Sequence, residues 1–494
     1  MNSVTSHHHS FMAPSQLPPC NSQPQPPSGP PPTRTKTQML VDDGYLRVGQ
    51  MLIEGLKNPE RPKTLENILI IETGDQSDRI HISQRPDGQL YARINGRDYT
   101  FSTFDGRSNA PTFLHIKSAA GDDRITLDPN VTVRVKIEAG DGDDTVQAGG
   151  GHTSIYGGRG NDHIRLGSGT GYAEGNEGDD TIAGGTGHAA LYGNNGNDRL
   201  YAGSGPASKH SHLDGGAGDD HLYAGNGHTV LNGGQGNDLM VGYDQTTVYT
   251  GPGRDTVWAN TLKARLYAKT TDHLKGTQGS TATHMTPNEA GRQAFRIHGS
   301  PDFIQRVEDD LALLRASPQG QKMLEALDKA AVQNGAPVHI RQSNSANNLY
   351  DFWSTELQRM ADAHQHPENP NDPKMGYIKD GVPGARADDA TIFYNPAHIY
   401  GSDMPLVQLY HEMAHAWNGA NGTFLAGESA PTSEHPQCPG PPNDELQAVG
   451  LPSSAAPYDF DNDPSTPPTS TNPAPFTENT LNEEMGKPLR MSYT

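Results

Sequence analysis

The chain has 494 residues, a formal net charge of −21, 56 glycines and 39 prolines, and only 32% of its residues are hydrophobic. The length predicts two to four domains, and the composition is too rich in Gly and Pro for one compact globule. The charge argues against nucleic acid as the main partner, because phosphate binding needs clustered Lys and Arg. Two cysteines, Cys20 and Cys438, exclude a disulfide framework. The sequence contains no apolar run of about 18 residues, so no transmembrane segment is predicted.

The N-terminal segment, residues 1–42, is dominated by Pro, Ser, Gln and His, and Asp42 is its first acidic residue. Such a composition buries too little apolar surface to offset the entropy of ordering, so we expect disorder. It resembles the N-terminal export signals of type III secretion effectors, which implies an export or targeting segment. The tract His7-His8-His9 is interpreted as an incidental polar stretch rather than a metal site.

Residues 43–117 predict a small β-rich region. Short alternating runs, including NILIIET and LYARI, are separated by the turn signals Pro86-Asp87-Gly88 and Asn95-Gly96. The simplest interpretation is a cap for the repeats that follow.

Residues 118–260 contain a glycine-rich repeat, with most units 18 residues apart and one interval of 22 residues. In register the units read AGDGDDTV (139–146), GGRGNDHI (157–164), GNEGDDTI (175–182), GNNGNDRL (193–200), GGAGDDHL (215–222) and GGQGNDLM (233–240). They resemble the RTX, or haemolysin-type, calcium-binding repeat, whose fold is a parallel β-roll. We therefore predict a β-solenoid in which each turn stacks on the next.

The resemblance implies calcium between successive turns, with an aspartate of each unit as a ligand. By position these candidate ligands are Asp144, Asp162, Asp180, Asp198, Asp220 and Asp238. The alternate halves, such as AGGTGHAAL, lack Asp, so calcium should line one edge only. The alternative is a calcium-free solenoid whose Asp and Asn cap turns by local hydrogen bonds. Repulsion between stacked carboxylates favours the calcium-binding hypothesis.

Residues 261–300 are polar and poorly patterned, which predicts a linker. Beyond it, residues 302–315 have apolar residues at helical spacing, and a second helix is predicted from the N-cap Ser317 to Gly335. Strands are expected at 337–341 and 390–394. We therefore predict an α+β domain over residues 301–494.

The run Leu406–Asn418 contains His411-Glu412-Met413-Ala414-His415, an HExxH pattern within a predicted helix. Residues four apart lie on one face of a helix, so the two histidines can bind one metal ion. Glu412 would lie beside the metal, where it can take a proton from a water that the metal activates. The alternative is an amphipathic helix with two exposed histidines.

Zinc requires a third protein ligand. The acidic or histidine candidates after His415 are Glu428, Glu434, His435, Asp444 and Glu445. Residues 443–452 predict a short second helix with Glu445 in its first turn. A Glu about 30 residues after the second His, on a second helix, resembles the arrangement of gluzincin-type proteases, so Glu445 is preferred and Glu428 is the second choice. The alternative for Glu445 is an acidic residue that is placed favourably at a helix N-terminus. Residues 476–486 predict another short helix. Near the C-terminus, Arg490 and Tyr493 have the side chains that stabilise an oxyanion, although exposed terminal residues are the simpler interpretation.

The segments HEMAHAWN (411–418), NDELQAVGLP (443–452) and FTENTLNEEMGKPLRMSYT (476–494) resemble the NleD-type family of type III effector zinc metallopeptidases. The clostridial neurotoxin light chains have a similar layout. The resemblance implies a zincin-like zinc endopeptidase with His411, His415 and Glu445 as ligands and Glu412 as the base. Arg490 and Tyr493 would stabilise the transition state.

The resemblance to the NleD-type family also implies delivery into a host cell and a protein substrate. In this family the targets are stress-activated host kinases. We therefore predict a secreted, monomeric zinc endopeptidase that acts as a bacterial virulence effector. The competing hypothesis is a calcium-binding extracellular adhesion or binding protein with an inactive C-terminal domain. Type III export and the calcium-linked export typical of RTX proteins remain alternatives.

Overall fold

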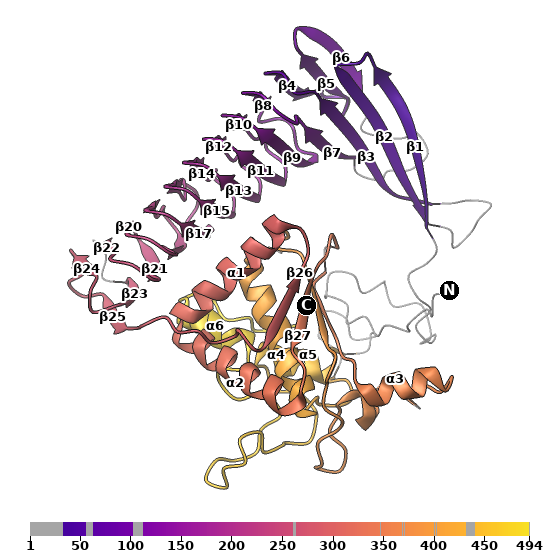
Figure 1. Cartoon of the computed structure of the whole chain (residues 1–494), viewed down its shortest axis with the longest axis vertical. Coiled ribbons are helices and arrows are strands. Elements are labelled where there is room, and N and C mark those ends of the chain that lie inside the picture. The colour runs from indigo at the N-terminus through magenta and orange to yellow at the C-terminus, as the bar shows by residue number, and fades with distance from the viewer. Residues whose placement is uncertain are drawn as a thin grey trace. The chain divides into compact units, whose positions relative to one another are not determined.

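A computed structural model describes residues 33–55, 63–101, 112–259, 263–345, 347–367, 369, 371–399, 401, 403–430 and 440–493. The chain divides into two compact units (Figure 1). One consists mainly of residues 30–286, and the other of residues 287–398 and 403–494. Each unit is described by itself. The expected roles of Cys20, Cys438 and the His7–His9 tract fall outside the described residues.

The first unit is a β-solenoid made of two long sheets that face each other (Figure 1). The strands of its 13-stranded sheet are, in spatial order, β1 (Thr33–Asp42), β2 (Leu46–Gly55), β3 (Lys63–Thr73), β7 (Thr112–Lys117), β9 (Arg134–Asp141), β11 (Thr153–Arg159), β13 (Gly171–Glu177), β15 (Ala189–Asn195), β17 (His210–Ala217), β19 (His228–Asn232), β21 (Gln245–Tyr249), β23 (Arg265–Ala268) and β25 (Thr281–His284). The strands of its 12-stranded sheet are β24 (His273–Lys275), β22 (Thr256–Ala259), β20 (Leu239–Gly242), β18 (His221–Tyr223), β16 (Arg199–Tyr201), β14 (Thr181–Ala183), β12 (His163–Arg165), β10 (Thr145–Gln147), β8 (Arg124–Leu127), β4 (Arg79–Gln84), β5 (Leu90–Ile94) and β6 (Arg97–Phe101).

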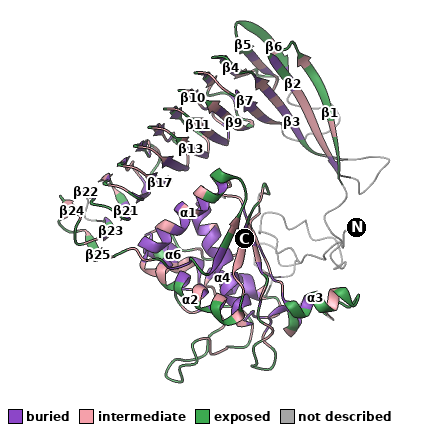
Figure 2. Ribbon diagram, in the orientation of Figure 1, coloured by how far each residue is buried: buried purple, intermediate pink, exposed green. Residues whose placement is uncertain are grey.

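The repeat period explains this architecture. Because successive units are mostly 18 residues apart, the apolar residue two positions after each aspartate pairs with its equivalent in the next turn, as Ile164 does with Ile182 and Ile182 with Leu200. These side chains are at most 2% exposed and belong to one continuous core. Figure 2 shows much of the ribbon of the solenoid strands in the colour of buried residues. Burial of each one contributes about 2 kcal/mol. The predicted parallel β-solenoid is confirmed.

Antiparallel strands close the N-terminal end of both sheets. The ribbon β1-β2-β3 extends one sheet and β4-β5-β6 extends the other, before parallel pairing begins at β7 and β8. The expected disorder of residues 1–42 is wrong for Thr33–Asp42, which form β1. This strand buries little side-chain surface, and backbone pairing with β2 orders it, together with ion pairs from Arg34 and Lys36 to Glu54.

The expected linker at residues 261–300 is also wrong in part, because the solenoid continues through it. Strands β23 and β25 extend one sheet, and β24 extends the other. The first strand of the second unit, β26 (Phe295–His298), falls in the same stretch. The polar composition hid these strands because each is only three or four residues long.

The second unit is an α+β domain with a four-stranded sheet in the order β26-β27-β29-β28. Strands β26, β27 and β29 are parallel, and β28 is antiparallel at one edge. Besides β26, its elements are α1 (Pro301–Ala316), α2 (Pro318–Asn334), β27 (Val338–Gln342), β28 (Leu349–Asp351), α3 (Thr355–Asp362), η2 (Pro373–Met375), β29 (Thr391–Tyr394), α4 (Pro405–Asn421), α5 (Asn443–Val449) and α6 (Glu478–Glu484).

The helix α4 is the buried centre of this unit, and it contacts α2, α5, α6, β28 and β29. Its bounds have clear causes: Pro405 fits the first turn, and Gly422 ends the helix in the left-handed conformation at φ +69°. The predicted helices at 302–315, 317–335, 406–418, 443–452 and 476–486 are confirmed as α1, α2, α4, α5 and α6. The sequence did not predict α3 or β28.

Candidate metal centre

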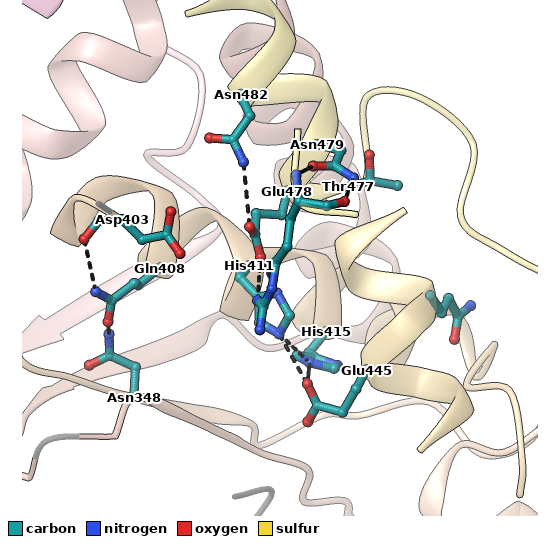
Figure 3. A network of polar contacts seen from close by, with 12 residues as sticks. Asn348, Asp403, Gln408, His411, His415, Glu445, Thr477, Glu478, Asn479 and Asn482 are labelled. Atoms are coloured by element: carbon teal, nitrogen blue, oxygen red, sulfur yellow. Dashed lines mark hydrogen bonds and ion pairs between the residues drawn. The ribbon is translucent and has the colours of Figure 1, made fainter. Parts of the chain in front are cut away.

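The two histidines of the HExxH pattern lie one turn apart on α4 and point the same way (Figure 3). The Nε2 atoms of His411 and His415 are 3.1 Å apart. Both side chains are largely buried, at 11% and 2% exposure. The alternative of two solvent-exposed histidines is therefore wrong.

The helix α5 places a carboxylate against both imidazoles. Oε2 of Glu445 lies 3.2 Å from Nε2 of His411 and 3.5 Å from Nε2 of His415. Gln447, on the same helix, donates to Oδ1 of Asn418 at 3.1 Å and to Oδ1 of Asn472 at 2.8 Å. This buried amide network joins α5 to α4 and so fixes the position of Glu445.

The three side chains fit a tetrahedral metal ion. Their ligand atoms lie within 4.8 Å of one another, with separations of 3.1, 3.2 and 3.5 Å. Metal–ligand bonds of about 2.0–2.1 Å at tetrahedral angles require ligand atoms about 3.3–3.4 Å apart. Two imidazoles and one carboxylate are also a donor set that zinc uses in peptidases. We conclude that the residues present could hold zinc.

Glu478 is the member of the site that the sequence did not reveal. Its Oε2 lies 3.0 Å from Nδ1 of His411 and 3.1 Å from Nη1 of Arg490. Its Oε1 accepts from the Asn482 amide at 3.4 Å, and Figure 3 shows the contacts of Glu478 with His411 and Asn482. A carboxylate behind a ligand histidine fixes the orientation of the ring and increases its basicity. Glu478 is 3% exposed, and an acidic residue at the start of a short predicted helix was the only available signal.

The charges around His411 favour a cation. Burial lowers the pKa of His411, but the hydrogen bonds to Glu445 and Glu478 outweigh burial and raise this pKa to about 10 in the metal-free protein. The pKa of Glu445 is raised by burial and lowered more strongly by His415 and His411, so it falls below its usual range. A divalent metal ion at this position would be stabilised by the same negative charges of Glu445 and Glu478.

Glu412 lies next to the histidines without joining the cluster of ligand atoms. Burial raises its pKa, and the neighbouring histidines and the main-chain N–H of Tyr350, which donates to its carboxylate, oppose that shift. The ring of Tyr350 stacks on His415 with centroids 6.5 Å apart. The edge strand β28, which contains Tyr350, is thereby held beside Glu412.

The C-terminal segment brings Arg490 and Tyr493 to the same site. The guanidinium carbon of Arg490 lies 4.9 Å from the centre of the Tyr493 ring, and Tyr493 forms a side-chain hydrogen bond with Glu445. Burial and the charge of Glu445 raise the pKa of Tyr493 well above its usual value, so its hydroxyl stays protonated at neutral pH. The interpretation of these two residues as simply exposed terminal side chains is wrong.

Asn479 holds this segment by its backbone. Its amide donates to the Arg490 carbonyl at 2.8 Å, and its Oδ1 accepts the Arg490 N–H at 2.7 Å. Adjacent residues at the start of α6 therefore bind both the main chain and the guanidinium of Arg490.

The other candidates for the third ligand are not in the described cluster. Glu428 is exposed, and Asp444 is buried with its Oδ2 accepting from the Tyr377 hydroxyl at 2.8 Å. Glu434 and His435 lie outside the described residues. Among the residues that the structure describes, Glu445 alone joins the two histidines.

In the solenoid, the six predicted aspartates belong to a longer row, which we call the aspartate column. In each turn the main-chain N–H of the aspartate donates to Oδ1 of the aspartate in the next turn, at 2.6–3.2 Å. The column consists of Asp78, Asp123, Asp144, Asp162, Asp180, Asp198, Asp220, Asp238, Asp255 and Asp272.

The second carboxylate oxygen of most column members is buried without a hydrogen bond. This holds for Oδ2 of Asp78, Asp123, Asp144, Asp162, Asp180, Asp198, Asp220 and Asp238. Burial raises the pKa of Asp162 to about 7 and that of Asp220 to about 9. Oδ1 thus forms turn-capping bonds of the kind expected for a calcium-free solenoid, whereas Oδ2 requires a proton or a cation. The donor chemistry fits calcium, which prefers carboxylate and carbonyl oxygens.

The fold and the site define a protein with a repeat solenoid and a C-terminal α+β domain that contains a buried His-His-Glu cluster. Residues 291–493 match the Peptidase_M91 family, described as effector protein. Residues 138–172, 174–206 and 211–240 match the RTX calcium-binding nonapeptide repeat. The C-terminal domain is thus of the NleD-type effector peptidase family, with RTX repeats upstream.

No curated protein and no solved structure matches the chain. The two families indicate a secreted effector peptidase that acts on a protein. Among the described residues, no helix is both long and apolar enough to span a membrane.

Proposed function

We propose that the C-terminal domain is a zinc endopeptidase with His411, His415 and Glu445 as the metal ligands. The observation that carries this proposal is the set of three buried ligand atoms separated by 3.1, 3.2 and 3.5 Å, which is close to the separation of about 3.3–3.4 Å that a tetrahedral metal ion requires. Glu478 supports it, because this carboxylate holds His411 from behind at 3.0 Å.

The surrounding residues divide the catalytic work. Zinc bound there would act as a Lewis acid toward the peptide carbonyl and the attacking water. Glu412 accepts the proton of the water and then gives it to the leaving amine, for which its buried position next to both histidines is suitable. The Tyr493 hydroxyl and the Arg490 guanidinium donate to the oxyanion that develops on the carbonyl oxygen.

The substrate is proposed to be an extended segment of a protein that pairs with β28. Strand β29 cannot take this role, because it lies between β27 and β28 and both of its sides are paired. The edge strand β28 is joined to the catalytic region by the hydrogen bond from Tyr350 to Glu412. Exposed sheet edges bind extended peptides by main-chain hydrogen bonds. The NleD-type resemblance makes host kinases the first substrates to test.

Paired variants test the metal assignment. Glu445→Gln should reduce bound zinc from one per chain to well below one and abolish peptide cleavage. Glu428→Gln is the matched control, since Glu428 is exposed, and it should keep both zinc and activity.

Glu412→Gln should keep zinc and lose cleavage by about 10³-fold or more, as removal of a general base does. New peptide termini in host lysate, compared between the wild type and Glu412→Gln, would identify the substrate. Cleavage by Glu412→Gln at the wild-type rate would disprove the mechanism.

We also propose that the aspartate column binds calcium along one edge of the solenoid. The buried Oδ2 atoms supply the donors, and the alternate half-repeats, such as AGGTGHAAL, contain no Asp. Calcium titration of the chain should raise its melting temperature, because a ligand that binds the folded state stabilises it. An unchanged melting temperature and circular dichroism spectrum up to millimolar calcium would refute this proposal.

A further inference from the structure

The hydrogen bonding of the Oδ2 atoms changes at the C-terminal end of the aspartate column. Up to Asp238, the Oδ2 atoms are buried without hydrogen bonds. In the next turn, Oδ2 of Asp255 lies 2.8 Å from Nζ of Lys269. The same atom that lacks a partner in the preceding turns is therefore bound to an ammonium group in this one.

The partners of this ammonium are oxygen atoms of the kind that bind hard metal ions. Besides Asp255, Nζ of Lys269 donates to the carbonyl oxygen of Gly251 and lies 3.3 Å from Oδ1 of Asp272. The Lys269 side chain is 13% exposed, and the side chains of both aspartates are fully buried. Two carboxylates and a turn carbonyl form an all-oxygen donor set, which hard cations prefer.

A second buried lysine, in the Asp-free half-repeats, donates to backbone carbonyls alone. Nζ of Lys209 donates to the carbonyls of Gly185 at 2.6 Å and of Ala202 at 2.5 Å, and the residue is 1% exposed. Lys209 lies in the one repeat interval of 22 residues, so the insertion supplies the cation. In two different places of the repeat domain, therefore, the ammonium group of a lysine of the same chain donates to oxygen atoms of the turns.

We propose that Lys269 is a tethered cation that replaces calcium in the last turn of the aspartate column. Calcium occupies the positions next to the free Oδ2 atoms of the earlier turns, and the ammonium excludes it from Asp255 and Asp272. The C-terminal end of the solenoid therefore closes without metal. This inference rests on the proposal that the column binds calcium and is independent of the peptidase activity.

The test is to remove the charge of Lys269 and count calcium ions. Lys269→Gln should bind one more calcium per chain than the wild type in equilibrium dialysis followed by metal analysis. In EDTA its melting temperature should fall by about 10 °C, since a buried ion pair loses one partner, and calcium should restore it. Lys269→Arg keeps the charge and should bind the wild-type number of ions. Lys275→Gln is the matched control, because Lys275 is exposed and lies over the Trp258 ring at 5.2 Å.

Counting calcium ions in the wild type and in Lys269→Gln distinguishes the role of Lys269 from calcium binding by the column and from the zinc peptidase activity. If the wild type binds calcium and Lys269→Gln binds the same number of ions, Lys269 does not occupy a cation position. If Lys269→Gln unfolds in EDTA and refolds with an additional ion in calcium, the inference holds. A variant that stays unfolded in calcium contradicts it. If the wild type binds no calcium, both the column proposal and this inference fail, while the zinc and cleavage assays are unaffected.

Discussion

Glu478 offers the sharpest test of how this domain prepares its metal site. Its carboxylate is 3.0 Å from Nδ1 of His411 and 3.1 Å from Nη1 of Arg490, so one side chain orients both a proposed zinc ligand and a proposed oxyanion donor. Glu478→Gln keeps the size of the side chain and removes its charge. Loss of a carboxylate behind a ligand histidine reduces metal affinity about 10- to 100-fold, which corresponds to about 1.4–2.7 kcal/mol of binding free energy.

The assay is zinc competition against a chelator, with peptide cleavage measured at saturating zinc. We expect weaker zinc binding and also a lower kcat at saturating zinc, because Arg490 loses its anchor. The matched control is Glu483→Gln, on the same helix but exposed, which should change neither quantity. Wild-type zinc affinity in Glu478→Gln would refute the idea that this carboxylate supports the metal site. Reduced affinity with normal kcat at saturating zinc would refute only its role toward Arg490.

Two further predictions concern the backbone. Asn479→Ala removes both hydrogen bonds to the main chain of Arg490, so kcat should fall about tenfold while zinc content stays at one per chain; unchanged kcat would show that the segment is held without this residue. Gly158→Ala should lower the melting temperature of the solenoid by at least several degrees, because Gly158 has φ +120° and a Cβ would lie 1.9 Å from the Gly140 carbonyl oxygen. Gly49→Ala, where the nearest atom would be 3.9 Å away, should have little effect.

The sequence predicted what depends on local pattern. The HExxH spacing located the helix of the candidate metal centre, since two histidines one turn apart share a face of any helix. Glu445 was found because it lies in the first turn of a short predicted helix and because that segment resembles a known family. The fixed repeat period predicted the solenoid and its core, since the same apolar position recurs in every turn.

What the sequence missed depends on long-range pairing. Glu478 contacts His411 across 67 residues, and no local pattern marks an acidic residue as the partner of a distant histidine. Asp78 and Asp272 belong to the aspartate column although neither is in a GGxGxD unit, because the register between turns places them there. Strand β28 has only three residues, too few to show a period of two.

The residue before each of the six predicted column aspartates, Asp144 to Asp238, also follows a pattern. This outer position alternates between acid and amide, as Asp143, Asn161, Asp179, Asn197, Asp219 and Asn237. The amides of Asn161, Asn197 and Asn237 donate to the carboxylate one turn earlier at 3.3, 3.1 and 3.1 Å.

Alternation has an electrostatic consequence for cation binding. Neighbouring strands lie about 4.8 Å apart, so an all-Asp outer position would place carboxylates that far apart, with a repulsion of about 0.9 kcal/mol per pair even in water. Placing Asn in every second turn roughly doubles the separation and halves this repulsion. The outer carboxylates of Asp143, Asp179 and Asp219 also accept a hydrogen bond from an amide, whereas the Oδ2 atoms of the column from Asp78 to Asp238 have no donor. The carboxylate oxygen atoms that lack a positively charged partner or a hydrogen-bond donor are therefore the Oδ2 atoms of the buried column. In one turn of this column, the ammonium group of Lys269 is that partner.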